Sequence, residues 1–151
     1  MKNHYLKFAL MMLSSFVFMY AAMFFNVDQF DHIYLSHTRT YMALYMVGPM
    51  ALIMLAFMAP MYKNKAKNAV IVVLAVLVTS LSYYFLRDQT TVKDIQYMKA
   101  MIPHHSSAIL VSQQATLEDP ETRALAKEII EAQKREIAEM KKIINRLENE
   151  D

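Results

Sequence analysis

Three long stretches of the sequence contain no Asp, Glu, Lys or Arg, and this feature constrains the fold most. They cover residues 8–27, 40–62 and 68–86, which are 20, 23 and 19 residues long. A helix rises by about 1.5 Å per residue, so roughly 20 residues cross the hydrocarbon core of a membrane, which is about 30 Å thick. The sequence therefore predicts a transmembrane region over residues 1–88 with three membrane-spanning helices.

The first stretch has a second interpretation as a cleaved signal peptide. Lys2 and Lys7 precede an apolar run that ends near Ala21 and Ala22. The apolar core of a signal peptide has about 7 to 15 residues and is followed by a small-x-small cleavage site. Because this run is longer and lacks a clear site of that kind, we expect the first helix to remain in the protein.

The distribution of lysine predicts the orientation in the membrane. The connector over residues 62–68 holds three lysines, whereas the connector over residues 26–39 holds two aspartates and one arginine. Connectors rich in lysine and arginine stay on the cytoplasmic side. We therefore expect a multi-pass protein of the bacterial inner (cytoplasmic) membrane, with the N-terminus in the cytoplasm and residues 89–151 outside it.

The second stretch carries a row of methionines. They recur every four residues, at Met42, Met46, Met50, Met54 and Met58. Methionine is flexible and fills gaps between packed helices, which is the simpler interpretation of the row. A path of thioether groups that guides Cu(I) is the alternative.

Composition excludes several classes of function. The chain has a single glycine, Gly48, so it cannot form the glycine-rich loops that hold nucleotide phosphates. It has no cysteine, so any site for a soft metal must use methionine and histidine. The formal net charge of +2 is too small to indicate a nucleic-acid partner.

Residues 89–151 carry most of the charge and predict two helices. Thr91 and Asp94 have the spacing of a capping box, which opens a helix to about Thr116. Asp119 followed by Pro120 has the form of an N-cap and a first-turn proline, which opens a second helix to about residue 147. The short link predicts an extracytoplasmic antiparallel two-helix hairpin. Two helices bury little surface, so we expect a homodimer that completes a four-helix bundle.

The second of these helices has an apolar seam with two polar breaks, Gln133 and Glu136. The seam positions are Ala126, Gln133, Met140 and Leu147, then Ile129, Glu136 and Ile143, with Ile130, Ile137 and Ile144 beside them. A carboxylate inside such a seam needs a partner, a proton or a metal ion. Glu136 could equally lie at a solvated edge of the seam or fix its register.

Histidine and methionine gather on the first of the two helices. His105 shares a helical face with Met98, Met101 flanks it, and His104 is one step further round. In an antiparallel hairpin, Met140 and Glu136 of the second helix approach this cluster. Imidazole and thioether together suit copper, and Cu(I) in particular, although a lone histidine on an apolar face is more often a core residue.

Two motifs in this region resemble a known family. The run MIPHH at residues 101–105 and the pattern IIxxQxxEIxxM at residues 129–140 are similar to those of the domain of unknown function 305. The resemblance implies a ferritin-like helical bundle, extracytoplasmic placement and an association with copper. It also implies signature positions at His104, His105, Gln133, Glu136 and Met140. Ser106 and Ser107 stand where Gln-Gly or Gln-Gln is common, and Val111 stands where many members carry methionine.

These features predict a membrane-anchored, extracytoplasmic metal-binding protein for copper storage, delivery or resistance, with the ion as Cu(I) or Cu(II). The expected metal-binding residues are Met98, Met101, His104, His105, Gln133, Glu136 and Met140. The expected partners are membrane lipid, a second copy bound through residues 89–151, and a copper-handling protein. The alternative is a helical interaction module with no metal. We do not expect an enzyme, because the sequence has no Glu-x-x-His pair, no HExxH motif and no nucleophile paired with a base.

Overall fold

The computed structural model describes residues 4–150, so Lys2 lies outside the described part of the chain. Within residues 4–150 the chain forms five α-helices and two short 3-10 helices, and it contains no strand. The all-α prediction is therefore confirmed for the described residues. The chain divides into two compact units. One contains the residues up to Met23 and Thr38–Thr91, and the other contains Phe24–His37 and the residues from Val92 onward.

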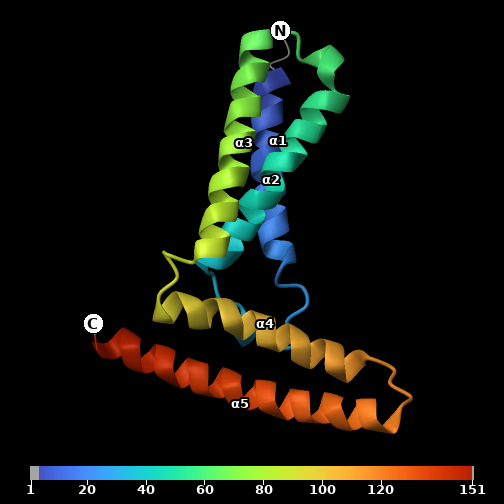
Figure 1. The fold of residues 1–151 in the computed structure, drawn as a ribbon, viewed down its shortest axis with the longest axis vertical. Coiled ribbons are helices and arrows are strands. Elements are labelled where there is room, and N and C mark those ends of the chain that lie inside the picture. The colour runs from blue at the N-terminus through green and yellow to red at the C-terminus, as the bar shows by residue number, and fades with distance from the viewer. Residues whose placement is uncertain (1–3, 151) are drawn as a thin grey trace. The chain divides into compact units, whose positions relative to one another are not determined.

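The first unit contains three long helices: α1 (His4–Ala22), α2 (His37–Phe57) and α3 (Lys65–Asp88) (Figure 1). All three are long and apolar enough to cross a membrane, which confirms the prediction of three such helices. Their packing forms a core of five buried residues, with methionines from α1, from α2 and from the position directly after α2 around it. The buried residues are Phe8, Ala51, Leu55, Tyr62 and Ala75, and the flanking methionines are Met11, Met12, Met54 and Met58.

The ends of these helices differ from the uncharged stretches. The first stretch was expected to reach residue 27, but α1 ends at Ala22. The second helix ends at Phe57 rather than Tyr62, and a 3-10 turn, η2 (Ala59–Met61), follows it. Pro60 has no amide hydrogen to bond to a carbonyl one turn earlier, so the α-helical hydrogen-bond pattern does not continue through it. Helix α3 begins at Lys65 because the Asn64 side chain accepts a hydrogen bond of 3.0 Å from the Lys67 amide.

The single glycine marks a close approach between α2 and α3. A Cβ atom on Gly48 would lie 1.9 Å from Oγ1 of Thr79 and 2.8 Å from the carbonyl oxygen of Ala75. Both distances are shorter than any van der Waals contact, so only glycine fits this crossing. The Thr79 hydroxyl donates a hydrogen bond of 2.7 Å to the same Ala75 carbonyl.

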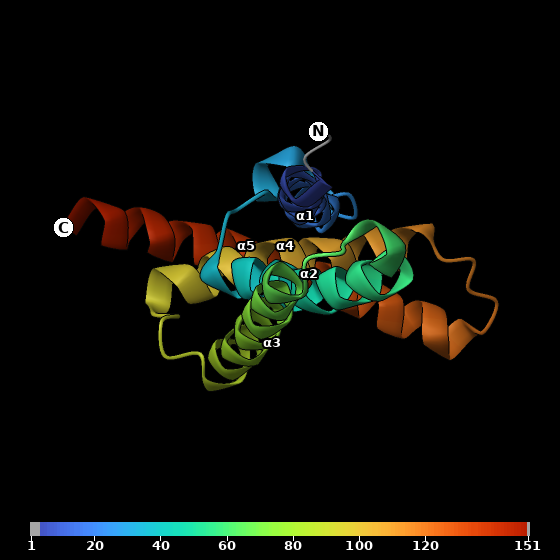
Figure 2. The same cartoon turned by 90° about the horizontal axis from the view of Figure 1, so that it is seen from above.

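The second unit contains α4 (Asp94–Gln114), α5 (Pro120–Glu150) and the connector Phe24–His37 with its 3-10 turn η1 (Phe30–His32). Helices α4 and α5 lie side by side along their length (Figures 1 and 2). Lys99 near the start of α4 forms an ion pair of 2.7 Å with Glu148 near the end of α5, so the two helices run in opposite directions. Their shared core consists of Met98, Ile102, Ile109, Ile137 and Ile144.

The two predicted helix starts have different outcomes. Asp119 caps α5 as expected, because its Oδ2 accepts hydrogen bonds from the amide and the hydroxyl of Thr122, at 2.7 and 2.8 Å. The capping box at Thr91 is wrong: α4 begins at Asp94, and its N-cap residue, Lys93, makes no side-chain capping bond. The Thr91 hydroxyl instead lies 2.6 Å from the hydroxyl of Tyr41. The Thr91 hydroxyl therefore contacts a residue 50 positions away in the sequence, instead of a backbone amide in the first turn of α4.

Candidate metal-binding groove

The buried seam of α5 is shifted from the predicted one by one position. Ile137 and Ile144 are buried, with 4% and 2% of their surface exposed, and Ile130 packs against them. Met140, Ile143 and Leu147 lie at the edge of this core. The Glu136 side chain is 52% exposed. Glu136 thus lies at the solvated edge of the seam. This agrees with the interpretation of the sequence in which Glu136 is not buried.

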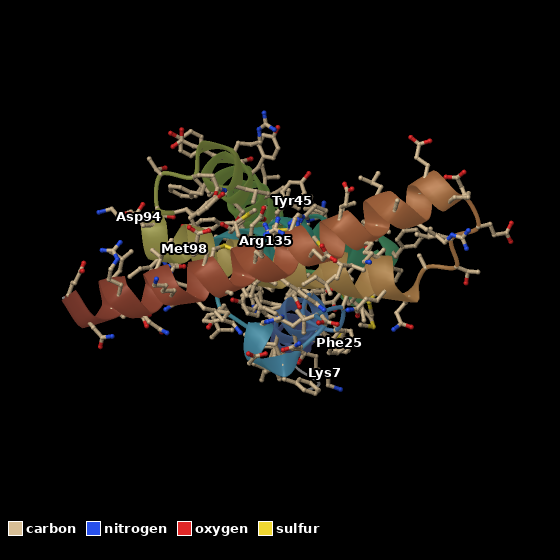
Figure 3. All side chains as sticks on the ribbon, turned by 90° about the horizontal axis from the view of Figure 1, so that it is seen from below. Lys7, Phe25, Tyr45, Asp94, Met98 and Arg135 are labelled. Atoms are coloured by element: carbon tan, nitrogen blue, oxygen red, sulfur yellow. The ribbon has the colours of Figure 1, made fainter. Side chains whose placement is uncertain are left out.

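An open groove runs between α4 and α5 on the side of Glu136. Its volume is about 480 Å³. Five of the seven predicted metal-binding residues line it: Met98, Met101, His105, Glu136 and Met140. The other lining residues are Asp94, Tyr97, Glu139, Ile143, Arg146 and Leu147. Asp94 and Met98 lie on successive turns of α4 (Figure 3). The floor is therefore rich in thioethers, and charged groups stand at the rim.

Two hydrogen bonds fix the imidazole of His105, which is 9% exposed. Its Nδ1 atom lies 3.0 Å from the carbonyl oxygen of Met101, and its Nε2 atom lies 2.7 Å from Oε2 of Glu136. A carbonyl oxygen only accepts, so we assign the Nδ1 hydrogen to that contact. In the neutral ring with its hydrogen on Nδ1, the Nε2 atom carries an electron pair at the groove, where it is available to a metal ion.

Two predicted residues do not line the groove. His104 is exposed, and its ring centroid lies 6.0 Å from that of His105. Adjacent residues on a helix point about 100° apart, so one of the two histidines faces α5 and the other does not. Gln133 is half-buried on α5, one turn before Glu136, and is also absent from the lining.

The donors in the groove are mainly soft. Within residues 4–150, no three His, Asp or Glu side chains come together as a group that could hold a metal ion. A site in this groove therefore depends on sulfur, with the imidazole of His105 as the nitrogen donor and three methionines around it. Thioether and imidazole favour Cu(I) over harder ions.

Hydrogen bonds to Ser106 and Ser107 on α4 hold the connector Phe24–His37, and we call this cluster the polar joint. The sequence did not predict it. The Ser106 hydroxyl, fully buried, accepts a hydrogen bond of 2.7 Å from the Asp28 amide and lies 2.9 Å from Nδ1 of His32. The Ser107 hydroxyl accepts a bond of 2.6 Å from the Asn26 side chain. These contacts fix the connector Phe24–His37 on α4. The available signal was the serine pair itself, where the resembled family has other residues.

Burial and nearby charges shift the pKa values of two side chains in this joint, His32 and Asp31. Burial lowers the pKa of His32 below 6.5, the nearby positive charge of Lys141 lowers it further, and Asp31 and Asp28 oppose the shift. The Lys141 ammonium, 2.5 Å from Oδ2 of Asp31, lowers the pKa of that carboxyl through a hydrogen bond. Burial therefore favours the neutral imidazole of His32, and the ion pair between Lys141 and Asp31 ties the connector to α5.

Comparison with known proteins identifies the family. Residues 84–150 match the family model described as Domain of unknown function (DUF305). The chain is also 33% identical to Uncharacterized protein L153 of Acanthamoeba polyphaga mimivirus over 139 residues, which cover 90% of each chain. No solved structure matches it. The match to the viral protein is longer than the family match and extends into the apolar N-terminal part of the chain. The chain belongs to the DUF305 family, and its α4–α5 pair lies within the part that the family model matches.

Proposed function

We propose that this protein is a membrane-anchored copper-binding protein, and that the groove between α4 and α5 is its metal site. The observation that carries the proposal is the placement of His105. Its Nε2 atom faces a groove that three thioether side chains line, and its Nδ1 atom is held by the Met101 carbonyl. Metal-binding histidines commonly use the second ring nitrogen in this way, which fixes the orientation of the first.

The residues present fit copper. Met98 and Met101 on α4, Met140 on α5 and the His105 imidazole would hold Cu(I) with sulfur and nitrogen donors. His104 points out of the groove, which leaves one imidazole there rather than the pair that Cu(II) would use. Glu136 is exposed and can turn away when the ion takes its place on Nε2. Glu136 and Gln133 then flank the site rather than form its centre.

The two-unit division supports the proposed orientation in the membrane. The connector Phe24–His37 follows the first apolar helix, and α4 follows the third. After one crossing and after three crossings of a membrane the chain is on the same side. The connector and the α4–α5 pair form one compact unit, which agrees with this arrangement. The lysine connector between α2 and α3 then faces the cytoplasm. The groove would then face outward from a bacterial inner membrane. There it would serve copper storage, delivery or resistance, together with a copper-handling partner protein.

We also propose that a second copy covers the remaining apolar surface of the second unit. Tyr97, Val111 and Leu125 are 56%, 61% and 56% exposed. Two antiparallel helices with one connector bury only part of their apolar faces, and pairing of two copies into a ferritin-like four-helix bundle would bury more.

The alternative is a helical interaction module with no metal. The contact between His105 and Glu136 favours it, because the pair satisfies both groups in the absence of an ion. The alternative predicts that variants of His105 change folding or assembly and leave no metal-dependent property to lose.

Copper titration of the full-length protein in detergent, under reducing conditions and against a colorimetric Cu(I) chelator, separates the two functions. The proposal expects one high-affinity Cu(I) per chain. Binding no tighter than that of a His105→Ala variant would leave the interaction module as the better explanation.

A further inference from the structure

A second concave site lies in the first unit, between α1 and α3. This crevice has a volume of about 350 Å³. Its lining is apolar apart from one ammonium group and one phenol: Tyr5, Phe8, Ala9, Ala66, Lys67, Val70 and Ile71. The two alanines leave the space that larger side chains would fill. The crevice lies at the end of the unit where α1 and α3 both begin (Figure 1).

Hydrogen bonds hold Tyr5 rigidly at the polar end of this crevice. Its hydroxyl accepts a bond of 3.0 Å from the Asn64 amide and lies 2.9 Å from Oδ1 of Asn68. The Asn68 amide group in turn donates to the Tyr62 carbonyl at 2.7 Å. The Tyr5 ring also packs against the Tyr62 ring, with centroids 5.3 Å apart. The wall of the crevice is therefore fixed before any ligand binds.

The positive charge at the rim is also positioned. Nζ of Lys67 lies over the face of the Tyr5 ring, 5.0 Å from its centroid, which is a cation–π contact. Lys63 and Lys65 are exposed at the same end of the unit, beside the start of α3. An apolar crevice with an ammonium group at its mouth is complementary to a molecule with an apolar chain and an anionic head.

We propose that this crevice binds one anionic phospholipid, with an acyl chain between α1 and α3 and the phosphate at Lys67. Juxtamembrane lysines attract anionic lipids, and a membrane supplies such chains next to apolar helices. The inference rests on the proposed membrane placement and is independent of copper. The acyl chain would cover the apolar side chains that line the crevice next to the hydrogen bonds of Tyr5.

Native mass spectrometry of the full-length protein in detergent tests the site. Phosphatidylglycerol and phosphatidylcholine with identical acyl chains are the two probes. We expect one phosphatidylglycerol to bind per chain in preference to phosphatidylcholine. The variant Lys67→Gln should weaken phosphatidylglycerol binding about fivefold, the effect of one juxtamembrane charge. The matched control, Lys65→Gln, removes the charge of a lysine two residues away that does not line the crevice, and should weaken the binding much less than Lys67→Gln.

A second variant tests the apolar part of the site. Ala9→Leu puts a larger side chain into the crevice and should reduce binding of both lipids, while circular dichroism verifies that the helices persist. Equal affinity for the two lipids, or equal loss in the two lysine variants, would overturn the proposal. So would a second copy of the chain bound in place of lipid. Copper binding, measured in the same samples, should be the same in all these variants, so failure of either proposal is seen separately.

Discussion

The Nε2 atom of His105 lies 2.7 Å from Oε2 of Glu136, while Nδ1 of the same ring lies 3.0 Å from the Met101 carbonyl oxygen. One ring nitrogen is thus held by backbone, and the other is held by an exposed carboxylate that can be displaced. The backbone contact belongs to α4 itself and persists when the carboxylate leaves. A metal ion at Nε2 would replace the contact with Glu136 and leave the backbone contact of Nδ1 in place.

The first prediction separates the two adjacent histidines. His105→Ala should weaken Cu(I) binding by more than about 100-fold, because loss of a ligand exceeds the effect of losing a group that only orients one. His104→Ala should leave the affinity nearly unchanged, since its side chain lies outside the groove. Chelator competition on the full-length variants measures both. His105→Gln serves if the alanine variant unfolds, and similar losses for positions 104 and 105 would contradict the assignment.

The second prediction concerns the methionine that α5 contributes. Met140→Leu nearly conserves volume, so it should cost less than about 1.5 kcal/mol of unfolding free energy. It removes one soft donor, and Cu(I) affinity should therefore fall while Cu(II) affinity changes little. Met54→Leu is the control, because Met54 packs against the core of the first unit. Equal losses for Cu(I) and Cu(II) would show that sulfur at position 140 is not a ligand.

Local signals in the sequence predicted the helices well, and contacts distant in the sequence account for the errors. The Asp119 cap depends on groups within one turn, so its residues alone specify it. The Thr91 cap failed because Tyr41, 50 residues away, contacts the same hydroxyl. The seam of α5 was misplaced by one position for the same kind of reason. Ile137 faces both α4 and a connector that the sequence did not assign to this unit.

The candidate site was predictable in part. Helical spacing placed Met98, Met101 and His105 on one side of α4, and the groove contains all three. Spacing did not decide which of the two adjacent histidines faces α5, because that depends on the rotation of α4 in the packed pair. The role of Ser106 was not predictable either, since its partners, Asp28 and His32, lie in another segment.

The third prediction tests the joint at Ser106. Ser106→Ala leaves the Asp28 amide and the His32 ring without their partner in a buried place, so it should lower the unfolding free energy by about 1–3 kcal/mol. Ser107→Ala should cost less, because its bond to Asn26 is exposed to solvent. Denaturant titration of the full-length protein, followed by circular dichroism, compares the two. A larger loss at Ser107 than at Ser106 would contradict the assigned joint.

The fourth prediction is the pH dependence of this joint. Burial lowers the pKa of His32, so the unfolded chain takes up a proton first as the pH falls below 6.5. The contribution of His32 to stability is complete above that pH and decreases until the lower pKa of the folded state is passed. Asp31, whose pKa the hydrogen bond from Lys141 lowers, loses its contribution only below about pH 3.8. Thermal unfolding of His32→Gln across the mildly acidic range should show a weaker pH dependence than the parent.

The last prediction concerns the crossing of α2 and α3. Gly48→Ala places a methyl group 1.9 Å from the Thr79 hydroxyl oxygen and 2.8 Å from the Ala75 carbonyl, so one of the helices must move. Overpacking of this kind costs about 1–3 kcal/mol. The double variant Gly48→Ala, Thr79→Ala removes the closer clash and keeps the backbone one, so it should recover part of the loss. Thr79→Ala alone, measured by thermal unfolding in detergent, is the control. Full recovery in the double variant would mean that the backbones of the two helices are not in close contact. Unchanged stability of Gly48→Ala would show that α2 and α3 do not approach each other closely at this position.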